Sequence, residues 1–338
     1  MNVAEVRELA RCCGFELAGA TAAVPAAGRA RYRDWVAAGL AGEMRYLTDR
    51  RAGLRDDPRN LLGSAQSVVC VGKLYRTPQP ARGWISRYAW GDDYHRVVRR
   101  GLRRLDGLLR ERAGGPYESK ICVDTAPLLE RSYARLAGLG WIGKNTCLIH
   151  QGTGSWYFLG ELLVSIPIEG DASCAPPPNR CGTCRRCIDA CPTAAIAPES
   201  GVDARLCISY LTIDLRGAIP EELRAPLGGH VFGCDICQDV CPWNRRAPET
   251  DEPEFAPRHF PPALEDLATV SQEEFRRMFR ETPVERARYS GFLRNVAVAM
   301  GNSRSPEFRA PLEKLAESAD AVVADHARWA LRRLGEPK

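Results

Sequence analysis

Cysteine is the residue type whose spacing in this sequence most clearly predicts chemistry. The chain has 338 residues and 14 cysteines, and most of these cysteines fall in one short segment. The first four in that segment follow the spacing Cys-x2-Cys-x2-Cys-x3-Cys-Pro, which is the pattern of bacterial ferredoxins. Zinc sites more often use two separated Cys-x2-Cys pairs, so the run favours iron–sulfur clusters over zinc. The cysteines of the segment are Cys181, Cys184, Cys187, Cys191, Cys207, Cys234, Cys237 and Cys241.

These cysteines divide into two sets of four. In a two-cluster ferredoxin run, the fourth cysteine ligates the other cluster. The second half of the pattern ends in Cys241-Pro242, and its first cysteine lies far upstream at Cys207. We therefore predict two 4Fe-4S clusters, one held by Cys181, Cys184, Cys187 and Cys241, and the other by Cys191, Cys207, Cys234 and Cys237. Two such clusters form a one-electron relay, which requires a terminal acceptor.

The N-terminus and the remaining cysteines indicate a reducing compartment. The first residues carry Glu5, Arg7, Glu8 and Arg11 and lack the apolar segment of a signal peptide. No uncharged apolar run is long enough to span a membrane, so we expect a cytoplasmic protein without a membrane anchor. Disulfides are rare in the cytoplasm. The other six cysteines are therefore expected to be small buried residues: Cys12, Cys13, Cys70, Cys122, Cys147 and Cys174.

Composition and local pattern predict a globular protein with mixed α/β structure. Hydrophobic residues make up 45% and charged residues 26%, which excludes a disordered chain. Helices are predicted at Val3–Cys12, 94–112 and 127–137, and strands at 66–71, 120–123, 146–149 and 156–168. Helices and strands that alternate in this way favour a sheet covered by helices. Beyond the cysteines, helices are predicted at 271–280, 292–300, 311–317 and 321–334, and the last two should form an antiparallel, HEAT-like pair.

Two proline-rich breaks divide the chain into three expected domains. The first break, at 171–180, contains three consecutive prolines, which neither a helix nor a central strand can accommodate. The second follows the cysteines at about 247–262. We expect an N-terminal α/β domain over 1–172, a ferredoxin-type module over 173–248 and a C-terminal helical segment over 249–338.

The charge permits a polyanionic partner without requiring one. The formal net charge is +5. One face of the helix predicted at 94–112 is basic, and this face is either an ordinary solvated surface or a nucleic-acid contact. The arginines on that face are Arg96, Arg99, Arg100, Arg103, Arg104 and Arg110, and a second basic group near the C-terminus contains Arg328, Arg332 and Arg333.

Two further motifs outside the cysteines could have functional meaning. Gly138 to Gly143 matches the dinucleotide pattern G-x-G-x-x-G, but it follows a predicted helix and precedes a strand, which is the reverse of the required order. These glycines are better explained by a tight turn or a close backbone approach. Asp124 follows the strand at 120–123, and it is either a functional carboxylate or the N-cap of the next helix. As a proton donor it would need a raised pKa, which burial could supply. The five histidines show no metal-ligand spacing.

Residues 43 to 246 resemble the epoxyqueuosine reductases of tRNA modification. The ordered combination of motifs is specific, whereas a ferredoxin run alone would not be. The matching stretches are Glu43–Leu47, Asp124–Arg131, Gly138–Asn145, Gly154–Trp156, Leu159–Glu161, the Cys181 run, Cys207–Ile213 and Phe232–Asn244.

The resemblance implies a function that the spacing of residues could not supply. Members of the family reduce epoxyqueuosine to queuosine at the wobble position of tRNA, the last step of queuosine biosynthesis, using cobalamin fed by two 4Fe-4S clusters. The implied fold is a cobalamin-binding α/β domain similar to that of reductive dehalogenases, followed by a double-cluster module and a helical segment. The implied partners are the tRNA anticodon stem-loop and an external electron donor, and we expect a monomer.

The resemblance also implies roles for individual residues. Asp124 would donate a proton to the departing epoxide oxygen, and Arg216 would contact tRNA. The residues expected to line the cobalamin, several through backbone groups, are Arg50, Asp124, Leu148, Leu159, Ser209, Asp214, Cys234 and Asp235.

Two alternatives from other classes remain at this point. A reductive dehalogenase shares the cobalamin and the two clusters, but its respiratory forms carry a twin-arginine export signal that this N-terminus lacks. A ferredoxin-type electron carrier would leave the long segment before Cys181 without a function.

Overall fold

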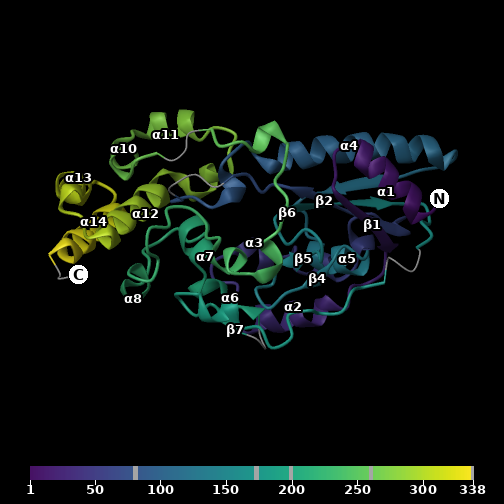
Figure 1. The fold of residues 1–338 in the computed structure, drawn as a ribbon, viewed down its shortest axis with the longest axis horizontal. Helices are drawn as coiled ribbons and strands as arrows, with labels where there is room; N and C mark the ends of the chain where they lie inside the picture. The colour runs from purple at the N-terminus through teal and green to yellow at the C-terminus, as the bar shows by residue number, and fades with distance from the viewer. Residues whose placement is uncertain (79–82, 171–174, 198–200, 259–261, 336–338) are drawn as a thin grey trace.

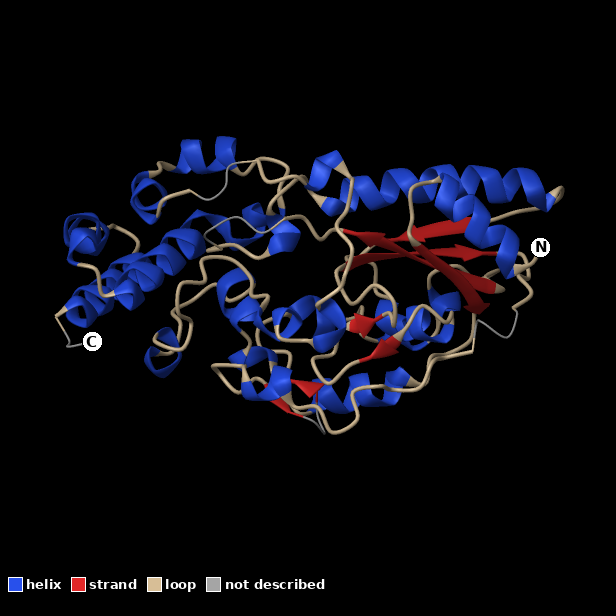
Figure 2. Ribbon diagram, viewed as in Figure 1, coloured by secondary structure: helices blue, strands red, loops and turns tan. Residues whose placement is uncertain are grey.

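The computed structural model describes residues 1–78, 83–170, 175–197, 201–258 and 262–335. Figure 1 shows an elongated molecule, with the N-terminal sheet at one end and the C-terminal helices at the other. The short helices of the cysteine-rich segment lie between these two ends. Mixed α and β structure is thus confirmed, with the strands gathered mainly in the N-terminal part (Figure 2).

The main sheet has four antiparallel strands in the order β1-β2-β6-β3. Their bounds are β1 Leu17–Ala22, β2 Ser67–Leu74, β6 Tyr157–Val164 and β3 Ser119–Cys122. The predicted strand at 146–149 is shorter, because only β5 (Leu148–Ile149) pairs, in a separate ribbon with β4 (Trp141–Ile142). Strand β1 escaped prediction because its sequence LAGATA consists mostly of small residues, which give no clear strand pattern.

Alternation along the strands directs side chains to two separate cores. Val69 and Val71 of β2 face one core, whereas Val68 and Cys70 face the other, as the period of two in a strand requires. The first core is closed by α1 (Val3–Cys12) and α4 (Tyr94–Ala113), and the second by α5 (Glu130–Leu136). The sheet is therefore covered by helices on both faces (Figure 1).

The arginines of α4 are largely engaged within the molecule. Arg96 forms an ion pair with Glu281 at 2.6 Å, and Arg100 forms one with Glu254. Arg104 donates to the backbone oxygen of Cys12 at 3.2 Å. These contacts favour the ordinary surface interpretation of this face over a free stripe of phosphate ligands. Within the described residues, no helix combines the length and the apolar character needed to cross a membrane.

The cysteine-rich segment consists of short elements that position loops. It contains α6 (Arg186–Asp189), α7 (Ile208–Ile213), α8 (Glu221–Arg224) and α9 (Ile236–Asp239), with β7 (Ile196–Ala197) paired to β8 (Gly201–Val202). Helices α2 (Gly28–Ala37) and α3 (Arg45–Thr48) of the N-terminal part lie close to it (Figure 1). Tyr210 of α7 makes one of the links, because its hydroxyl accepts the backbone N–H of Glu43 at 2.8 Å.

The C-terminal helices share a core with the cysteine-rich segment. The helices are α10 (Leu264–Thr269), α11 (Gln272–Met278), α12 (Arg288–Ser303), α13 (Arg309–Ala316) and α14 (Ala321–Leu334). The predicted pair α13 and α14 is present, and α12 packs against both helices. Residues of α12 and α14 belong to the same buried cluster as Ile208, Phe232 and Trp90. This core crosses the expected boundaries at 172 and 248, so the three-domain division remains a prediction.

The second proline-rich break is packed against the N-terminal part. Phe255 is buried with its ring 5.1 Å from that of Phe158. The backbone N–H of Thr250 donates to the oxygen of Arg76 at 2.7 Å. Ala247 and Phe255 of this stretch therefore belong to the first core, and Pro253–Phe255 form a short 3-10 helix.

Candidate active site

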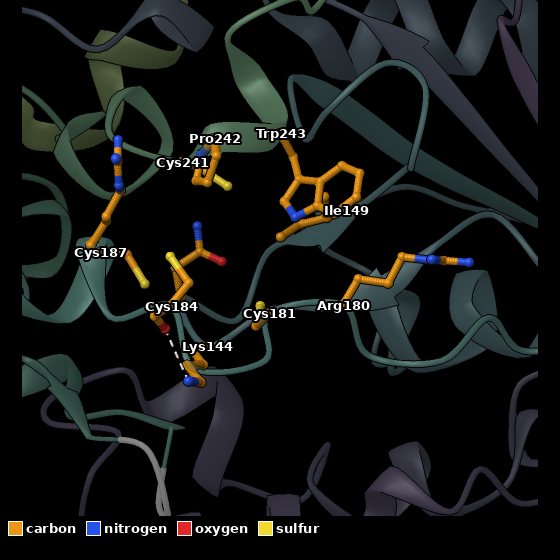
Figure 3. A pocket seen from close by; sticks show the side chains of 11 residues that line it. Lys144, Ile149, Arg180, Cys181, Cys184, Cys187, Cys241, Pro242 and Trp243 are labelled. Atoms are coloured by element: carbon orange, nitrogen blue, oxygen red, sulfur yellow. Dashed lines mark hydrogen bonds between the residues drawn. The ribbon is translucent and has the colours of Figure 1, made fainter.

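Four of the predicted cluster cysteines surround one cavity. Cys181, Cys184, Cys187 and Cys241 line a space of about 250 Å³, which Ile149, Pro242 and Trp243 close on one side (Figure 3). The Nζ atom of Lys144 donates to the backbone oxygens of Gly182 and Cys184, at 2.7 and 2.9 Å, and so fixes the turn between two of the cysteines. The structure thus brings the first predicted set of thiols together.

The second set also lies together. Burial, together with the neighbouring thiols of Cys207 and Cys191, raises the pKa of Cys234 to about 12. The pKa of Cys237 is raised well above its ordinary value by Cys147, by burial, and by Cys234 and Cys207. Such thiols would ionise only in the presence of a compensating cation, as cluster ligands do. No three described His, Cys, Asp or Glu side chains are arranged to hold a single metal ion.

The other cysteines differ in their surroundings. Cys13, Cys70 and Cys122 are buried, as expected. The expectation was wrong for Cys12, which is exposed because it ends α1 on the outer side. Cys147 is half-buried, and its thiol contacts that of Cys237, so it adjoins the second set without belonging to the spacing pattern. Cys174 lies outside the described residues.

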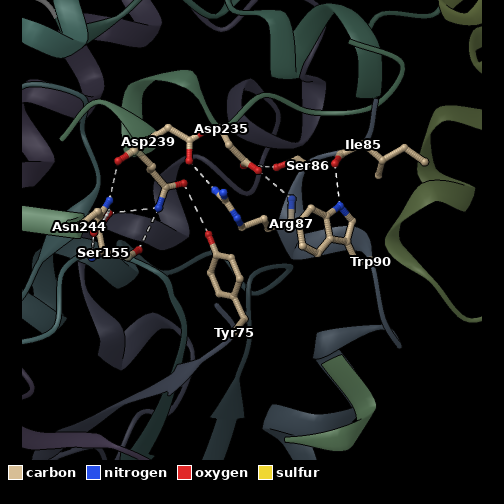
Figure 4. A network of polar contacts seen from close by, with 10 residues as sticks. Tyr75, Ile85, Ser86, Arg87, Trp90, Ser155, Asp235, Asp239 and Asn244 are labelled. Atoms are coloured by element: carbon tan, nitrogen blue, oxygen red, sulfur yellow. Dashed lines mark hydrogen bonds and ion pairs between the residues drawn. The ribbon is translucent and has the colours of Figure 1, made fainter. Parts of the chain in front are cut away.

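A polar network attaches α9, which carries Cys237, to the N-terminal part (Figure 4). The carboxylate of Asp235 accepts from the Ser86 hydroxyl and from the backbone N–H of Arg87. The guanidinium of Arg87 pairs with Asp239 and stands 4.6 Å from the ring centre of Trp156. These contacts fix the second set of thiols relative to the sheet.

Asn244 and Gln238 extend this network toward β6. The side-chain nitrogen of Asn244 donates to the hydroxyl of Ser155 at 3.0 Å and to the backbone oxygen of Gln238 at 2.8 Å. The side chain of Gln238 donates to the backbone oxygen of Ser155 at 3.0 Å. The segments after Cys237 and Cys241 are thereby held by the residue that precedes Trp156 and β6.

Asp124 occupies a strained loop after β3. Its φ is +49°, a left-handed conformation that residues other than glycine seldom adopt, although aspartate tolerates it better than most. Helix α5 begins at Glu130 with Leu129 as its N-cap, so the N-cap interpretation of Asp124 was wrong. The Asp124 side chain keeps 42% of its surface exposed. Strain at an accessible carboxylate is a common property of functional loops.

His95 faces the carboxylate of Asp124. The Nε2 atom of His95 lies 3.3 Å from a carboxylate oxygen of Asp124, and its Nδ1 atom lies 2.6 Å from Asp93. Burial alone would lower the pKa of His95, but the two carboxylates outweigh it and raise the pKa to about 9. Burial alone would raise the pKa of Asp124, but His95 and Arg286 outweigh it and lower that pKa. Burial by the chain alone therefore does not supply the raised pKa that a proton donor would need, because cations from distant segments face the carboxylate.

Arg286 brings the C-terminal part into the same site. It lies on the turn Pro283–Ala287, donates to Asp214 at 2.9 Å and approaches Asp124 to 4.0 Å. Its guanidinium stands 5.3 Å from the ring centre of Tyr46. The site thus combines residues from all three expected domains. His95 and Arg286 were missed from the sequence, and only the Asp93-x-His95 spacing at the start of α4 hinted at either.

The other residues predicted to line the cobalamin lie in different parts of the molecule. Burial raises the pKa of the Tyr88 hydroxyl well above its ordinary value, and the charges of Asp124, Asp214 and Asp235 raise it further, so the three carboxylates lie within electrostatic reach of one tyrosine. Leu148 is buried in the core behind α5, and Leu159 packs against that core. Ser209 and Cys234 are half-buried in the cysteine-rich segment, and no described contact links the exposed Arg50 with the others.

Arg216 and the glycines of the 138–143 motif both make contacts within the chain. The Arg216 side chain donates to the backbone oxygens of Arg286 and Ala287, at 2.8 and 3.3 Å, so it supports the turn that carries Arg286. Gly140 belongs to a close backbone approach, because a Cβ atom there would lie 2.3 Å from the backbone oxygen of Ile149. The motif begins just after α5 and contains β4 (Trp141–Ile142), and Gly138 has a φ of +81°, which fits the tight-turn interpretation.

Comparisons with known proteins agree with this geometry. A family model described as "Epoxyqueuosine reductase QueG, DUF1730" matches residues 55–125, and one described as "4Fe-4S double cluster binding domain" matches 180–244. An epoxyqueuosine reductase of Xanthomonas campestris is 41% identical, over 98% of this chain and 96% of its own. This chain belongs to the epoxyqueuosine reductase family. It is therefore an oxidoreductase with a double 4Fe-4S module, and the electron-carrier and dehalogenase alternatives are set aside.

Solved structures of the family share the fold. An epoxyqueuosine reductase crystallised with an epoxyqueuosine-modified tRNA-Tyr stem loop is 28% identical, with a TM-score of 0.86 over 98% of this chain and 90% of its own. Another, from Bacillus subtilis, has the same identity and TM-score over 99% of this chain and 90% of its own. In that protein a catalytic loop bearing an aspartate has swung out of the active site.

The residues present fit the cofactors that the family implies. The two groups of four thiols match the donor sets of two 4Fe-4S clusters. For cobalamin, the relevant observation is the partly exposed carboxylate of Asp124, which Arg286 approaches to 4.0 Å while it also pairs with Asp214. The exposed Asp124 carboxylate and the Arg286 guanidinium are groups that could meet the polar edge groups of such a cofactor.

Proposed function

We propose that this chain reduces epoxyqueuosine to queuosine at the wobble position of tRNA, using cobalamin and two 4Fe-4S clusters. Family membership over nearly the whole chain carries the proposal. Its support in the site is the pairing of His95 with the partly exposed Asp124 carboxylate, beside Arg286. The protein would act in the cytoplasm as a monomer.

The reaction consumes two electrons and two protons. Opening the epoxide and forming the alkene releases its oxygen as water. When bound, cobalamin would supply a strongly reduced cobalt centre that a protein side chain cannot provide. Asp124 would face the cofactor, and the residues that we propose to hold it, partly through backbone groups, are Arg50, Leu148, Leu159, Ser209, Asp214, Cys234 and Asp235.

The His95–Asp124 pair is the proposed source of the first proton. With the pKa of Asp124 lowered and that of His95 raised to about 9, the pair holds one proton at neutral pH. As negative charge develops on the departing oxygen, that proton moves through Asp124 to the oxygen. Arg286 keeps the Asp124 carboxylate oriented and compensates for its charge when His95 becomes neutral.

Electrons would enter at the first group of thiols. Its cavity is bordered by the exposed residues Arg180 and Arg186, whereas Cys207 and Cys234 of the second group pack against a buried core. The second cluster would be held in part by Cys234, next to Asp235, which we propose as a cofactor residue. An external one-electron donor would therefore reduce the outer cluster, and the inner cluster would pass electrons on.

The proposed substrate is the tRNA anticodon stem-loop. Arg216 is exposed and supports the turn that carries Arg286, so RNA that reaches Asp124 would pass beside it. Its contact with a phosphate remains part of the proposal. The exposed surface of Asp124 would be covered when the modified base enters.

A direct assay tests the proposed function. The purified chain, reconstituted with both cofactors and reduced, should convert an epoxyqueuosine-containing anticodon stem-loop to the queuosine form. Asp124→Asn should keep the iron content and the corrin absorption but lose turnover by about a hundredfold or more. Asp34→Asn, a change at an exposed carboxylate, is the matched control and should leave turnover intact. Absence of conversion by the fully loaded wild-type chain would refute the proposal.

A further inference from the structure

Glu161 is a buried carboxyl group without a hydrogen-bond donor. It lies on β6, opposite Cys70 of β2 and Cys122 of β3, and it is 0% exposed. Neither of its carboxylate oxygens receives a hydrogen bond within the described part of the chain. An ionised carboxylate in this position would lose its hydration without any replacement. Glu161 must therefore be neutral in the folded protein.

The neighbour of Glu161 is a second carboxyl group. Glu130, the first residue of α5, lies within hydrogen-bonding reach of Glu161. Two carboxyl groups can share a hydrogen bond only if one of them carries a proton. The Glu161 hydroxyl can donate to Glu130, and the Oε1 atom of Glu130 also accepts the backbone N–H of Asp124. Glu130 thus connects the buried carboxyl to the loop that carries Asp124.

The charges around the pair place Glu130 at the border of ionisation. Burial, followed by the charge of Asp124, raises its pKa to about 7, against the opposing effects of the Asp124 backbone N–H, Arg131 and His95. An acid with a pKa near the working pH transfers protons most effectively. The titratable and charged groups facing the pair are Cys70 on β2, Cys122 on β3, Asp124 on its loop, Tyr94 and His95 on α4, and Arg131 on α5.

The reaction needs two protons, and the His95–Asp124 pair holds only one of them. We propose that Glu130, supported by the neutral Glu161 carboxyl, supplies the second proton through Asp124 while the bound RNA covers the loop. This inference rests on the proposed function. An O–H bond breaks at Glu130 and one forms at the Asp124 carboxylate, which passes the proton to the departing oxygen. The oxygen leaves as water, and the reduced cofactors supply the two electrons.

Solvent restores the proton of Glu130 after the RNA dissociates. Because Glu130 and Glu161 act through Asp124, they are positioning residues rather than catalytic ones. The arrangement gives a role to a carboxyl group that is 0% exposed on the central strand β6, where its strand neighbours Leu162 and Leu163 are apolar. It also explains why the loop of Asp124 is attached by its backbone to a carboxyl group.

Single-turnover kinetics of the reduced holoenzyme provide the first test. With an epoxyqueuosine stem-loop, the wild-type rate should fall as pH rises through about 7. Glu130→Gln should lower the rate at pH 6 at least about tenfold, leave the half-saturating RNA concentration unchanged and remove the step near pH 7. The control Glu313→Gln, at an exposed position on α13, should behave as wild type. A uniform loss in Glu130→Gln that keeps the wild-type pH profile would indicate a structural role and overturn the inference.

Infrared spectroscopy of the carboxyl groups tests the pair independently of turnover. Wild type should show a protonated-carboxyl signal of which one part disappears around pH 7 and another part persists above it. Glu130→Gln should lose the titrating part, and Glu161→Gln should lose the persistent part. Retention of both parts in Glu130→Gln would refute the inference even if Glu161→Gln failed to fold. Inactivity of the loaded wild type would refute the proposed function, whereas the infrared result would still decide whether the pair holds its proton.

Discussion

Replacement of His95 by glutamine tests the electrostatic basis of the site. Glutamine keeps a polar group near Asp93 and Asp124 but cannot carry a positive charge. The rise of the His95 pKa from 6.5 to about 9 corresponds to about 3 kcal/mol of interaction with the two carboxylates. The Asp124 side chain is 42% exposed, so screening by solvent should reduce this contribution to about 1–2 kcal/mol.

The sign of the pH dependence follows from the direction of the shift. A group whose pKa is raised by folding contributes its stability fully below its unfolded pKa, here 6.5, and loses it as pH rises through the folded value of about 9. Wild type should therefore lose about 1–2 kcal/mol of unfolding free energy over this interval that His95→Gln does not lose. Urea unfolding of both proteins at the two ends of the interval measures the difference.

Nuclear magnetic resonance provides the direct measurement. The pKa of His150 is lowered by burial, and that of His326 is lowered to about 4, so neither should titrate in the alkaline range. A ring signal with a midpoint near 9 should appear in wild type and be absent from His95→Gln. If His95 titrated near 6.5, or if both proteins lost the same stability, the paired-charge account of Asp124 would be wrong.

Three further predictions concern the clusters, the network and the RNA. Cys184→Ser should reduce the iron content from about eight to about four atoms per chain. The control Cys12→Ser, at an exposed cysteine, should retain all of the iron. A full iron content in Cys184→Ser would contradict the ligand sets. Arg87→Met should lower the unfolding free energy by about 2 kcal/mol, because it removes the ion-pair partner of Asp239, a side chain that is only 8% exposed. Urea unfolding that showed no change in this free energy would count against the network. Affinity for the anticodon stem-loop should fall about tenfold or more between roughly 50 and 200 mM salt, and a titration that showed little change would argue against phosphate contacts.

Helices with a clear apolar period were predicted correctly from the sequence. The bounds of α1 and α14 agree with the prediction, because each helix has a clear apolar period and a capping residue, Asn2 and Asp320. Strand β1 was missed because it is defined by pairing with β2 rather than by its own residues. The structure gathers the thiols in the two predicted sets, since ferredoxin spacing reflects the short turns that present the sulfurs.

The pKa of Asp124 and the burial of Glu161 could not be predicted from the sequence. Asp124 was identified as a candidate, but the direction of its pKa depends on His95 and Arg286, which are distant in the chain. Glu161 follows an apolar strand pattern and gives no local sign that its carboxyl group is buried without a donor. Contacts between charged residues that are distant in the chain depend on tertiary packing, so the periodicity of the sequence does not predict them.

The core shared by α12 and the Cys207 segment has a consequence for how the protein is assembled in the cell. Cys207 and Cys234 pack against the same buried cluster as α12. All eight cluster cysteines leave the ribosome before α12, which begins at Arg288. The core against which Cys207 and Cys234 pack is therefore completed only after α12 has been synthesised.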